Sequence, residues 1–294
     1  MIVIPPVAIT PAMLVGTNAV DAAAWAAGTT YAAAAEVAYN YRTYVSLQAG
    51  NVGKNPATEP TWWYDSAPVN SMAAFDTSVS TATTATGGLW FTLALGQRTT
   101  ALGLMGLQGK SVTVTVKDGA LGPEIYTSTT NLARSDGTFY GFCFEDFAQT
   151  SDLNLTGLPS TTNAHVTVEV DGDGTTACGL CVLGKQFEIG QAEMGLGMPL
   201  EDRGRHYLDT LGNPVNVERG HSKGMTCTLH TDLSSYNRVM ALLAQTVGQP
   251  CMWIAAPGRG DLLSAAAFGR FVRATPVIQN SQYMTTSLEI AGNR

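Results

Sequence analysis

The segment Ser111-Val-Thr-Val-Thr-Val-Lys117 decides the fold class, because apolar and polar residues alternate along its whole length. The same alternation runs through Leu89–Leu95 and His165–Val170. A period of two is typical of a β-strand that buries one face and leaves the other to solvent or a partner. Asp118-Gly119 supplies a turn signal directly after the first segment. Several such strands without a convincing helix predict an antiparallel β-sandwich over residues 67–184, jelly-roll-like in type.

Residues 185–294 contain one amphipathic helix among strands. The predicted helix spans Ser234–Val247, and one of its faces carries the apolar residues Tyr236, Val239, Met240, Leu243 and Val247. Three strands are predicted after it, at Cys251–Ala255, Ala265–Ala274 and Tyr283–Ala291. The pattern indicates an α+β domain with one main helix, whose sheet another copy of the chain could complete. The chain as a whole is predicted to be mainly β.

The N-terminal part of the chain divides into an arm and an aromatic stretch. Residues 1–20 contain Pro5, Pro6 and Pro11, which favour an extended arm that pairs with another segment. Residues 21–66 hold three of the five tryptophans. A piece of about 40 residues is near the lower limit for folding alone, so some of its rings are expected to lie partly exposed. Exposed rings in a Gly/Asn/Thr frame favour a binding surface.

The order of aromatic and turn residues in 21–66 resembles the small chitin-binding type of carbohydrate-binding module. The resemblance rests on Trp25, Tyr31, Val37, Tyr39, Tyr44, Asn51, Gly53, Pro56, Trp62 and Trp63. Two turns depart from the family pattern, because Ala34-Ala35 replaces Gly-Asp and Tyr41 follows Asn40 where glycine is usual. The resemblance implies that Tyr44, Trp62 and Trp63 stack on sugar rings. The alternative is that these rings form a small core and an interdomain contact.

The remaining chain resembles virion proteins of tailed bacteriophages that are described as carbohydrate-binding tail proteins, with a C-terminal part similar to distal-tail and tail-tube proteins. The residues that carry this resemblance include Asn70–Asp76, Ala177–Gly184, Ile189-Gly190, Asp209, Gly212-Asn213, Arg219, Ser222-Lys223 and Pro250–Ile254. It implies a structural subunit of a tail tip or baseplate, arranged as a ring with other copies and neighbouring tail proteins. It also implies contact with host-surface glycans and a place in the virion after synthesis in the host cytoplasm. The alternative is a carbohydrate-binding accessory protein of a polysaccharide-degrading system.

Composition narrows the classes of partner. The formal net charge is −7 and no basic cluster or stripe is present, which argues against nucleic acid. No apolar run reaches the length of a membrane-spanning helix, and no Lys or Arg precedes Arg42, so neither membrane insertion nor a secretory signal is predicted. Charged residues make up only 13% of the chain. A low-charge surface favours an assembled subunit, although a Gly/Thr-rich β protein would also show it.

Cys178 and Cys181 are expected to be buried structural thiols. The odd number of cysteines, five, argues against a disulfide framework. Cys178 and Cys181 have redox or zinc spacing, but no second pair accompanies them, and they lie in the apolar run 177–183. Positions three apart on a strand face opposite sides, so the two thiols are not expected to form one site.

No catalytic residue, metal site or cofactor is predicted, and the chain is not expected to be an enzyme. The four histidines lack ligand spacing. A depolymerase using Glu145 or Asp146 is the enzymatic alternative, but adjacent strand residues point apart and no second carboxylate is indicated. Asp171-Gly-Asp-Gly174 is better explained as a hairpin turn than as a calcium loop. Arg259-Gly-Asp261 matches an integrin-binding tripeptide and most simply closes a loop.

Positive charge gathers in a short span of the C-terminal part. Four of the basic residues are Arg203, Arg205, Arg219 and Lys223. In an acidic protein this grouping favours ion pairs with carboxylates of an adjacent subunit. A solvated loop is the alternative, in which each pair contributes only about 0–1 kcal/mol.

Overall fold

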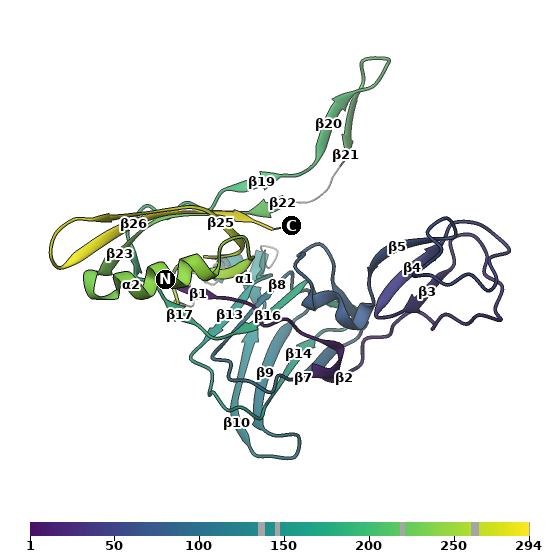
Figure 1. Cartoon of the computed structure of the whole chain (residues 1–294), viewed down its shortest axis with the longest axis horizontal. Helices are drawn as coiled ribbons and strands as arrows, with labels where there is room; N and C mark the ends of the chain where they lie inside the picture. Colours follow the sequence, from purple (N-terminus) through teal and green to yellow (C-terminus); the bar gives the residue numbers. More distant parts are fainter. Residues whose placement is uncertain (135–138, 145–147, 218–220, 260–264, 294) are drawn as a thin grey trace.

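The structure is a computed structural model that describes residues 1–134, 139–144, 148–217, 221–259 and 265–293. The chain is mainly β, with antiparallel sheets and one main helix, as the sequence predicts. Figure 1 shows a central body, a small module beyond one side of it, and a narrow ribbon that projects away from it. The module holds the strands between residues 36 and 68, the projecting part those between residues 200 and 223, and the rest of the described strands belong to the body.

The β-sandwich pairs a five-stranded sheet with a three-stranded sheet. The larger has the order β10-β9-β14-β7-β2 and consists of β2 (Leu14–Thr17), β7 (Leu89–Ala94), β9 (Ser111–Asp118), β10 (Glu124–Asn131) and β14 (Ala164–Asp171). The smaller has the order β13-β8-β16 and consists of β8 (Ala101–Met105), β13 (Leu153–Thr156) and β16 (Leu180–Gly184). The predicted alternation is confirmed, because the apolar positions of β7, β9 and β14 are all buried in one core. Their polar positions form the outer face of the larger sheet.

Short elements complete the sandwich. They are η1 (Pro11–Met13), η2 (Asn70–Phe75), β6 (Thr83–Thr86) paired with β15 (Thr175–Cys178), β11 (Ala133–Arg134) paired with β12 (Ala148–Gln149), and α1 (Phe139–Phe144). The prediction of a hairpin at 171–174 is wrong. Residues 171–174 connect β14 in one sheet to β15 in another, so the two strands do not pair with each other.

The C-terminal domain is a seven-stranded sheet with one helix packed against its core. The sheet order is β17-β1-β24-β25-β26-β23-β18, and its strands are β1 (Ile2–Ile4), β17 (Phe187–Glu188), β18 (Gln191–Ala192), β23 (Met225–Asp232), β24 (Cys251–Ile254), β25 (Ala266–Ile278) and β26 (Tyr283–Gly292). The two edge strands, β17 and β18, are separated along the chain only by Ile189 and Gly190. Helices η3 (Leu233–Ser235) and α2 (Tyr236–Gln245) follow β23, and Val239, Leu242 and Leu243 of α2 pack into the core.

The N-terminal segment joins the two large parts. Strand β1 lies between β17 and β24, and β2 pairs with β7 at the edge of the sandwich sheet. The expectation that another copy completes the C-terminal sheet is therefore wrong, because the chain's own first strand and residues 187–192 complete it. A shared cluster of buried side chains from β1, β8, β16, β24 and β25 fuses the two parts. Gly103 permits the close packing, since a Cβ there would lie 2.7 Å from Met252 Cε.

Three smaller sheets of the described residues lie outside this body, one in the aromatic module and two in the projecting part. The aromatic module consists of β3 (Glu36–Tyr39), β4 (Arg42–Ser46) and β5 (Trp63–Pro68) in one antiparallel sheet. The projecting part consists of β19 (Leu200–Asp202) paired with β22 (His221–Lys223), followed by β20 (Arg205–Leu208) paired with β21 (Pro214–Val217). We call residues 205–217 the ribbon, and β19 with β22 its stem (Figure 1).

Candidate functional site

The aromatic module builds its core from rings. Tyr44 of β4 and Trp63 of β5 are only 8% and 2% exposed, and they cluster with Val37 of β3. Tyr31 meets Trp63 edge to face with 5.3 Å between ring centroids, and the Trp63 indole donates a hydrogen bond of 2.8 Å to the Lys54 carbonyl. Edge-to-face pairs add to the stabilisation from burial. The small sheet therefore replaces a conventional aliphatic core with interlocking aromatic rings.

This arrangement corrects the expected accessibility of two predicted sugar-binding residues. Tyr44 and Trp63 are occupied by internal packing, so their ring faces do not form an open platform. The physical reason is that a sheet of three short strands has few other large side chains with which to exclude water. The alternative interpretation, a small aromatic core, describes these two residues. Sugar contact by the module stays a prediction that rests on other rings.

Trp62 is the predicted residue that keeps partial exposure. Its ring packs against the module core, and the Lys54 ammonium lies 5.5 Å from the ring centroid. Its backbone carbonyl accepts hydrogen bonds from the Leu47 N–H at 2.9 Å and from Asn51 Nδ2 at 3.4 Å. Trp62 is thus held in one position with its ring at the module surface.

Two exposed tyrosines of the module were not predicted as site residues. Tyr64 is 58% exposed, because it follows Trp63 on β5 and adjacent strand residues face opposite sides. Tyr41 is 62% exposed and occupies the turn between β3 and β4, where Asn40 and Tyr41 have φ values of 50° and 60°. The available sequence signals were the period of two for Tyr64 and the unusual Asn-Tyr turn for Tyr41. The exposed aromatic rings of the module are therefore Trp62 and Tyr64 near the start of β5, and Tyr41 at its other end, where the Tyr41 carbonyl accepts a hydrogen bond from the Val69 N–H.

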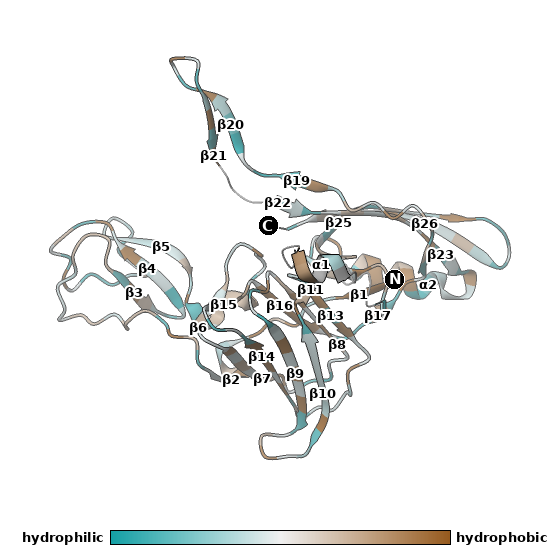
Figure 2. Cartoon of the chain, turned by 180° about the vertical axis from the view of Figure 1, so that it is seen from behind, coloured by the Kyte–Doolittle hydropathy of each residue, from teal (hydrophilic) through white to brown (hydrophobic). Residues whose placement is uncertain are grey.

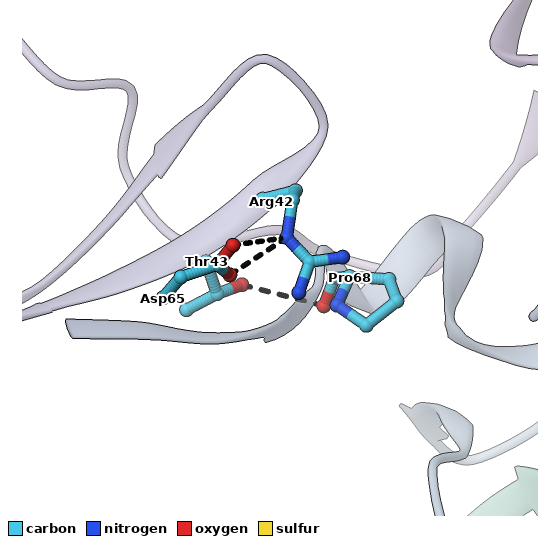
Figure 3. A network of polar contacts seen from close by, with 4 residues as sticks. All are labelled: Arg42, Thr43, Asp65 and Pro68. Carbon is cyan, nitrogen blue, oxygen red and sulfur yellow. Dashed lines mark hydrogen bonds and ion pairs between the residues drawn. The ribbon is translucent and has the colours of Figure 1, made fainter. Parts of the chain in front are cut away.

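A charged pair fixes the strand that carries Tyr64. Arg42 Nε donates to both oxygens of the Asp65 carboxylate, at 2.6 and 2.8 Å, from β4 to β5 (Figure 3). The Thr43 hydroxyl donates to the Pro68 carbonyl at 3.5 Å beside it. Both charged side chains are partly exposed, so the pair contributes modestly to stability. Its effect is to hold β5 in register next to the exposed rings.

The ribbon is a second candidate surface. Strands β20 and β21 pair only with each other among the described strands, and neither packs on another layer. One face carries Tyr207 opposite Val215, and Leu208 on the other face is 68% exposed. Figure 2 shows hydrophobic residues on this projecting part as well as in the body. An isolated two-stranded hairpin is marginally stable in water. These exposed apolar residues therefore indicate a contact surface for another molecule.

The tip of the ribbon is ordered by one carboxylate. Asp209 accepts hydrogen bonds from the N–H groups of Leu211 and Asn213, both at 2.8 Å, and from Asn213 Nδ2 at 3.1 Å. The hydrogen bonds from Asn213 hold the pKa of Asp209 below its ordinary value. Leu211, at the end of this tight turn, is 85% exposed. A leucine displayed on a preorganised turn binds with little loss of conformational entropy.

The basic residues near the ribbon pair within the chain. Arg203 Nη2 lies 2.7 Å from Glu201 Oε2, and Lys223 Nζ lies 2.8 Å from Asp152 Oδ2 in the sandwich. The Arg205 guanidinium lies over the Tyr207 ring at 5.0 Å. The expectation that Arg203 and Lys223 pair with an adjacent subunit is therefore wrong, because carboxylates of their own chain are within reach. Arg219 lies outside the described residues.

The predicted burial of Cys178 and Cys181 is confirmed. Cys178, Cys181, Cys227 and Cys251 are buried and unbridged, whereas Cys143 on α1 is exposed. Burial raises the pKa of Cys178 to about 12, which keeps this thiol protonated and unreactive. Within the described ranges, no three His, Cys, Asp or Glu side chains are grouped to hold a metal ion. Glu145, Asp146 and most of the 259–261 tripeptide lie outside those ranges.

Comparisons with known proteins leave the family open. No protein-family model matches the chain, and no curated protein matches it in sequence. One solved structure with some similarity is a variant of the lectin-binding domain of lectinolysin in complex with Lewis b. It is 13% identical, covers 39% of this chain and 82% of its own, and has a TM-score of 0.28. A likeness this loose carries no argument about function. Among the described residues, no helix is long and apolar enough to cross a membrane.

Proposed function

We propose that this chain is a structural subunit that joins other copies of itself through the ribbon. The observation that supports this is the exposed apolar surface of the ribbon, which its own body does not cover. Two open strand edges and a preorganised tip leucine suit insertion against a neighbouring copy. The 13% share of charged residues agrees with an assembled protein.

The finer proposal is a subunit of the tail tip or baseplate of a tailed bacteriophage. Its support is the order of motifs in the sequence, together with a fold in which a β-sandwich is fused to a seven-stranded sheet. In this role the chain is not an enzyme and works by assembly. Electron microscopy of particles labelled with an antibody against residues 21–66 tests it. Label at one end of a tail supports the proposal, and the absence of label from purified virions contradicts it.

A second role, weak contact with host-surface glycans, is proposed for Trp62 and Tyr64. This role is supported by the exposure of these rings on a small module that stands apart from the body (Figure 1). Many copies in one ring would make a weak contact effective, because avidity multiplies it. Replacing Trp62 and Tyr64 by alanine is expected to reduce adsorption to cells without reducing particle assembly. Unchanged adsorption, or loss of assembly, would refute a glycan role for these rings.

The assembly proposal is tested by sedimentation velocity of the full chain over a range of concentrations. The native chain is expected to sediment as a multimer, and the double variant Leu208→Ser/Leu211→Ser as a smaller species. Leu121→Ser is the matched control, because Leu121 is fully exposed on a turn of the sandwich. If the double variant keeps the native multimer, or if Leu121→Ser dissociates it equally, the ribbon is not the joining element.

A further inference from the structure

We propose a separate glycan-binding cleft on the outer face of the five-stranded sheet, centred on Trp90. The cleft has a volume of about 440 Å³ and lies where the start of β7, the start of β9 and the end of β14 meet. This volume is within the range of about 300–1,000 Å³ that is typical of small-molecule sites. Trp90, Glu169, Asp171, Ser111 and Thr113 contribute side chains to it.

The position of these side chains follows from strand register. Glu169 of β14 lies between Trp90 of β7 and Thr113 of β9, as direct neighbours on both sides. Asp171 lies beside Ser111 two residues further along. Residues directly opposite each other on antiparallel strands share one face. The aromatic ring, the two carboxylates and the two hydroxyls therefore open on the same side of the sheet, away from the core.

The N-terminal segment fixes Trp90 in place. The Trp90 N–H donates to Asn18 Oδ1 at 2.8 Å, and the Thr17 hydroxyl donates to the Trp90 carbonyl at 3.0 Å. Gly16 leaves room for the indole, since a Cβ there would lie 3.0 Å from Trp90 Cζ3. The side chain is 37% exposed. A tryptophan held by its backbone and resting on a glycine is a rigid platform with an accessible surface.

The carboxylates of the cleft are available to a ligand. Neither the Glu169 nor the Asp171 side chain forms a hydrogen bond or ion pair with any residue that the structure describes. Lys110, next to Ser111 in sequence, pairs with Asp173, and the nearby Asp171 carboxylate also helps to raise the Lys110 pKa, so Glu169 is the cleft carboxylate without a nearby cation among the described residues. Ionised carboxylates are strong hydrogen-bond acceptors, and adjacent hydroxyl groups of a sugar supply the matching donors.

The charge of the cleft selects among glycans. Its lining carries two carboxylates, and none of its described residues is basic. Lys117 and His165 are neighbours on the same face, but His165 lies four residues from Glu169, roughly 13 Å along the strand. Acidic sugars and phosphorylated ligands would be repelled. The expected occupant is therefore a neutral or amino-sugar segment of a polysaccharide, with one ring stacked on Trp90.

The surroundings of the cleft suit an extended chain. Threonine hydroxyls cover the sheet beside it, and they pair across strands as Thr92 with Thr167 and Thr113 with Thr129, both at 2.9 Å. The hydroxyl groups of this polar surface already form hydrogen bonds with one another. A sugar chain can therefore lie along it without leaving a buried donor without an acceptor. A second copy of the chain is the competing occupant, but it would have to bring a cation to Glu169.

The test uses the full chain with three defined probes: chitohexaose, cellohexaose and maltohexaose. Isothermal titration calorimetry is expected to detect binding of at least one. Trp90→Ala and Glu169→Gln are each expected to weaken it by about tenfold or more, while Trp90→Phe retains most of it. An oligogalacturonate hexamer is expected to bind more weakly than the neutral probe. Circular dichroism confirms that each variant is folded.

The control variant Trp62→Ala/Tyr64→Ala separates this cleft from the aromatic module. Binding that survives in this control and is lost in Glu169→Gln supports the cleft whatever the module does. The proposal is overturned if no neutral hexasaccharide binds, if Trp90→Ala and Glu169→Gln bind as the native chain does, or if the acidic probe binds best. A fall in sedimentation coefficient in Trp90→Ala, without sugar binding, would assign the face to a second copy instead.

Discussion

Tyr41 carries local backbone strain on the surface of the module. Its φ of 60° follows a φ of 50° at Asn40, and this pair of left-handed residues is the geometry of a type I′ turn. Asn-Gly is the preferred pair there, because a Cβ makes the left-handed region unfavourable by about 1–2 kcal/mol. Strained residues gather at functional sites. The strained turn at Tyr41 lies at the end of the module where the Tyr41 carbonyl accepts a hydrogen bond from the Val69 N–H.

Relief of this strain gives a prediction. Tyr41→Gly is expected to raise the free energy of unfolding of the module by about 0.5–1 kcal/mol relative to Tyr41→Ala. Alanine is the matched control, because it removes the ring but keeps the Cβ. Urea unfolding followed by tryptophan fluorescence measures the difference, since three of the five tryptophans lie in the module. Equal stability of the two variants would show that the turn is not strained.

The sequence located the aromatic residues of the module but not the side on which each ring lies. Trp62, Trp63 and Tyr64 are consecutive large rings, so no apolar–polar alternation marks the buried position. The family resemblance then predicted a sugar-binding role for Trp63. In the structure, Trp63 packs against Tyr31 and is buried, and Tyr64 is exposed. Trp90 shows the opposite case. Its alternation with Leu89 predicted that Trp90 lies on the solvent-exposed face of the sheet. The cleft itself was not predicted, because it is formed with cross-strand neighbours that are far away in sequence.

At the scale of elements, the stem of the ribbon is tied to the sandwich by Lys223 and Asp152. Their side chains are 18% and 9% exposed, in contrast to the open pair of Arg203 and Glu201. A largely buried charge that loses its partner is strongly destabilising. Because β22, which contains Lys223, pairs with β19, this ion pair also holds the base of the ribbon next to the sandwich.

Lys223→Met is therefore expected to lower the free energy of unfolding by about 3 kcal/mol, because it leaves Asp152 buried without its cation. Adding Asp152→Asn should recover most of the loss. Arg203→Met is the matched control, and its cost should stay below about 1 kcal/mol because its partner is exposed. Chemical denaturation of the four proteins measures these values. A loss for Lys223→Met no larger than the Arg203→Met loss would contradict this assignment.

A histidine links the stem to the ribbon and makes the junction sensitive to pH. His206 Nε2 lies 2.8 Å from Asp202 Oδ2, and His206 Nδ1 lies 3.0 Å from Asn216 Oδ1. Two acceptors favour the doubly protonated ring. The hydrogen bond to Asp202 first, and then that to Asn216, raises the pKa of His206 above its ordinary value.

The sign of the pH effect follows from this direction. A raised pKa in the folded state gives stability that is fully present below the unfolded value of 6.5 and is lost as the pH rises through the folded pKa. Asp202→Asn is expected to move the His206 pKa down towards its ordinary value in an NMR titration. Glu201→Gln, which changes the neighbouring carboxylate that pairs with Arg203, should leave it in place. No change in Asp202→Asn would refute the coupling.

On the scale of the whole molecule, long-range pairing decides what the sequence could not predict. Alternating segments and the amphipathic helix were located correctly, because local periodicity determines them. The completion of the C-terminal sheet was missed, since it joins Ile2–Ile4 to strands some 250 residues away. The pairing of β20 with β21 into a ribbon was also missed, because these strands are exposed on both faces and show no buried period. Its stability must come from contacts outside its own sheet.

The central claim is that the ribbon joins copies of the chain. The most direct measurement is the solution mass, by light scattering, of the full chain beside a variant in which residues 204–219 are replaced by Gly-Asn-Gly, which retains the stem. We predict a multimer for the full chain and a folded monomer for the variant at the same concentration. A monomeric full chain at every concentration, or a variant that keeps the multimer, would contradict the claim.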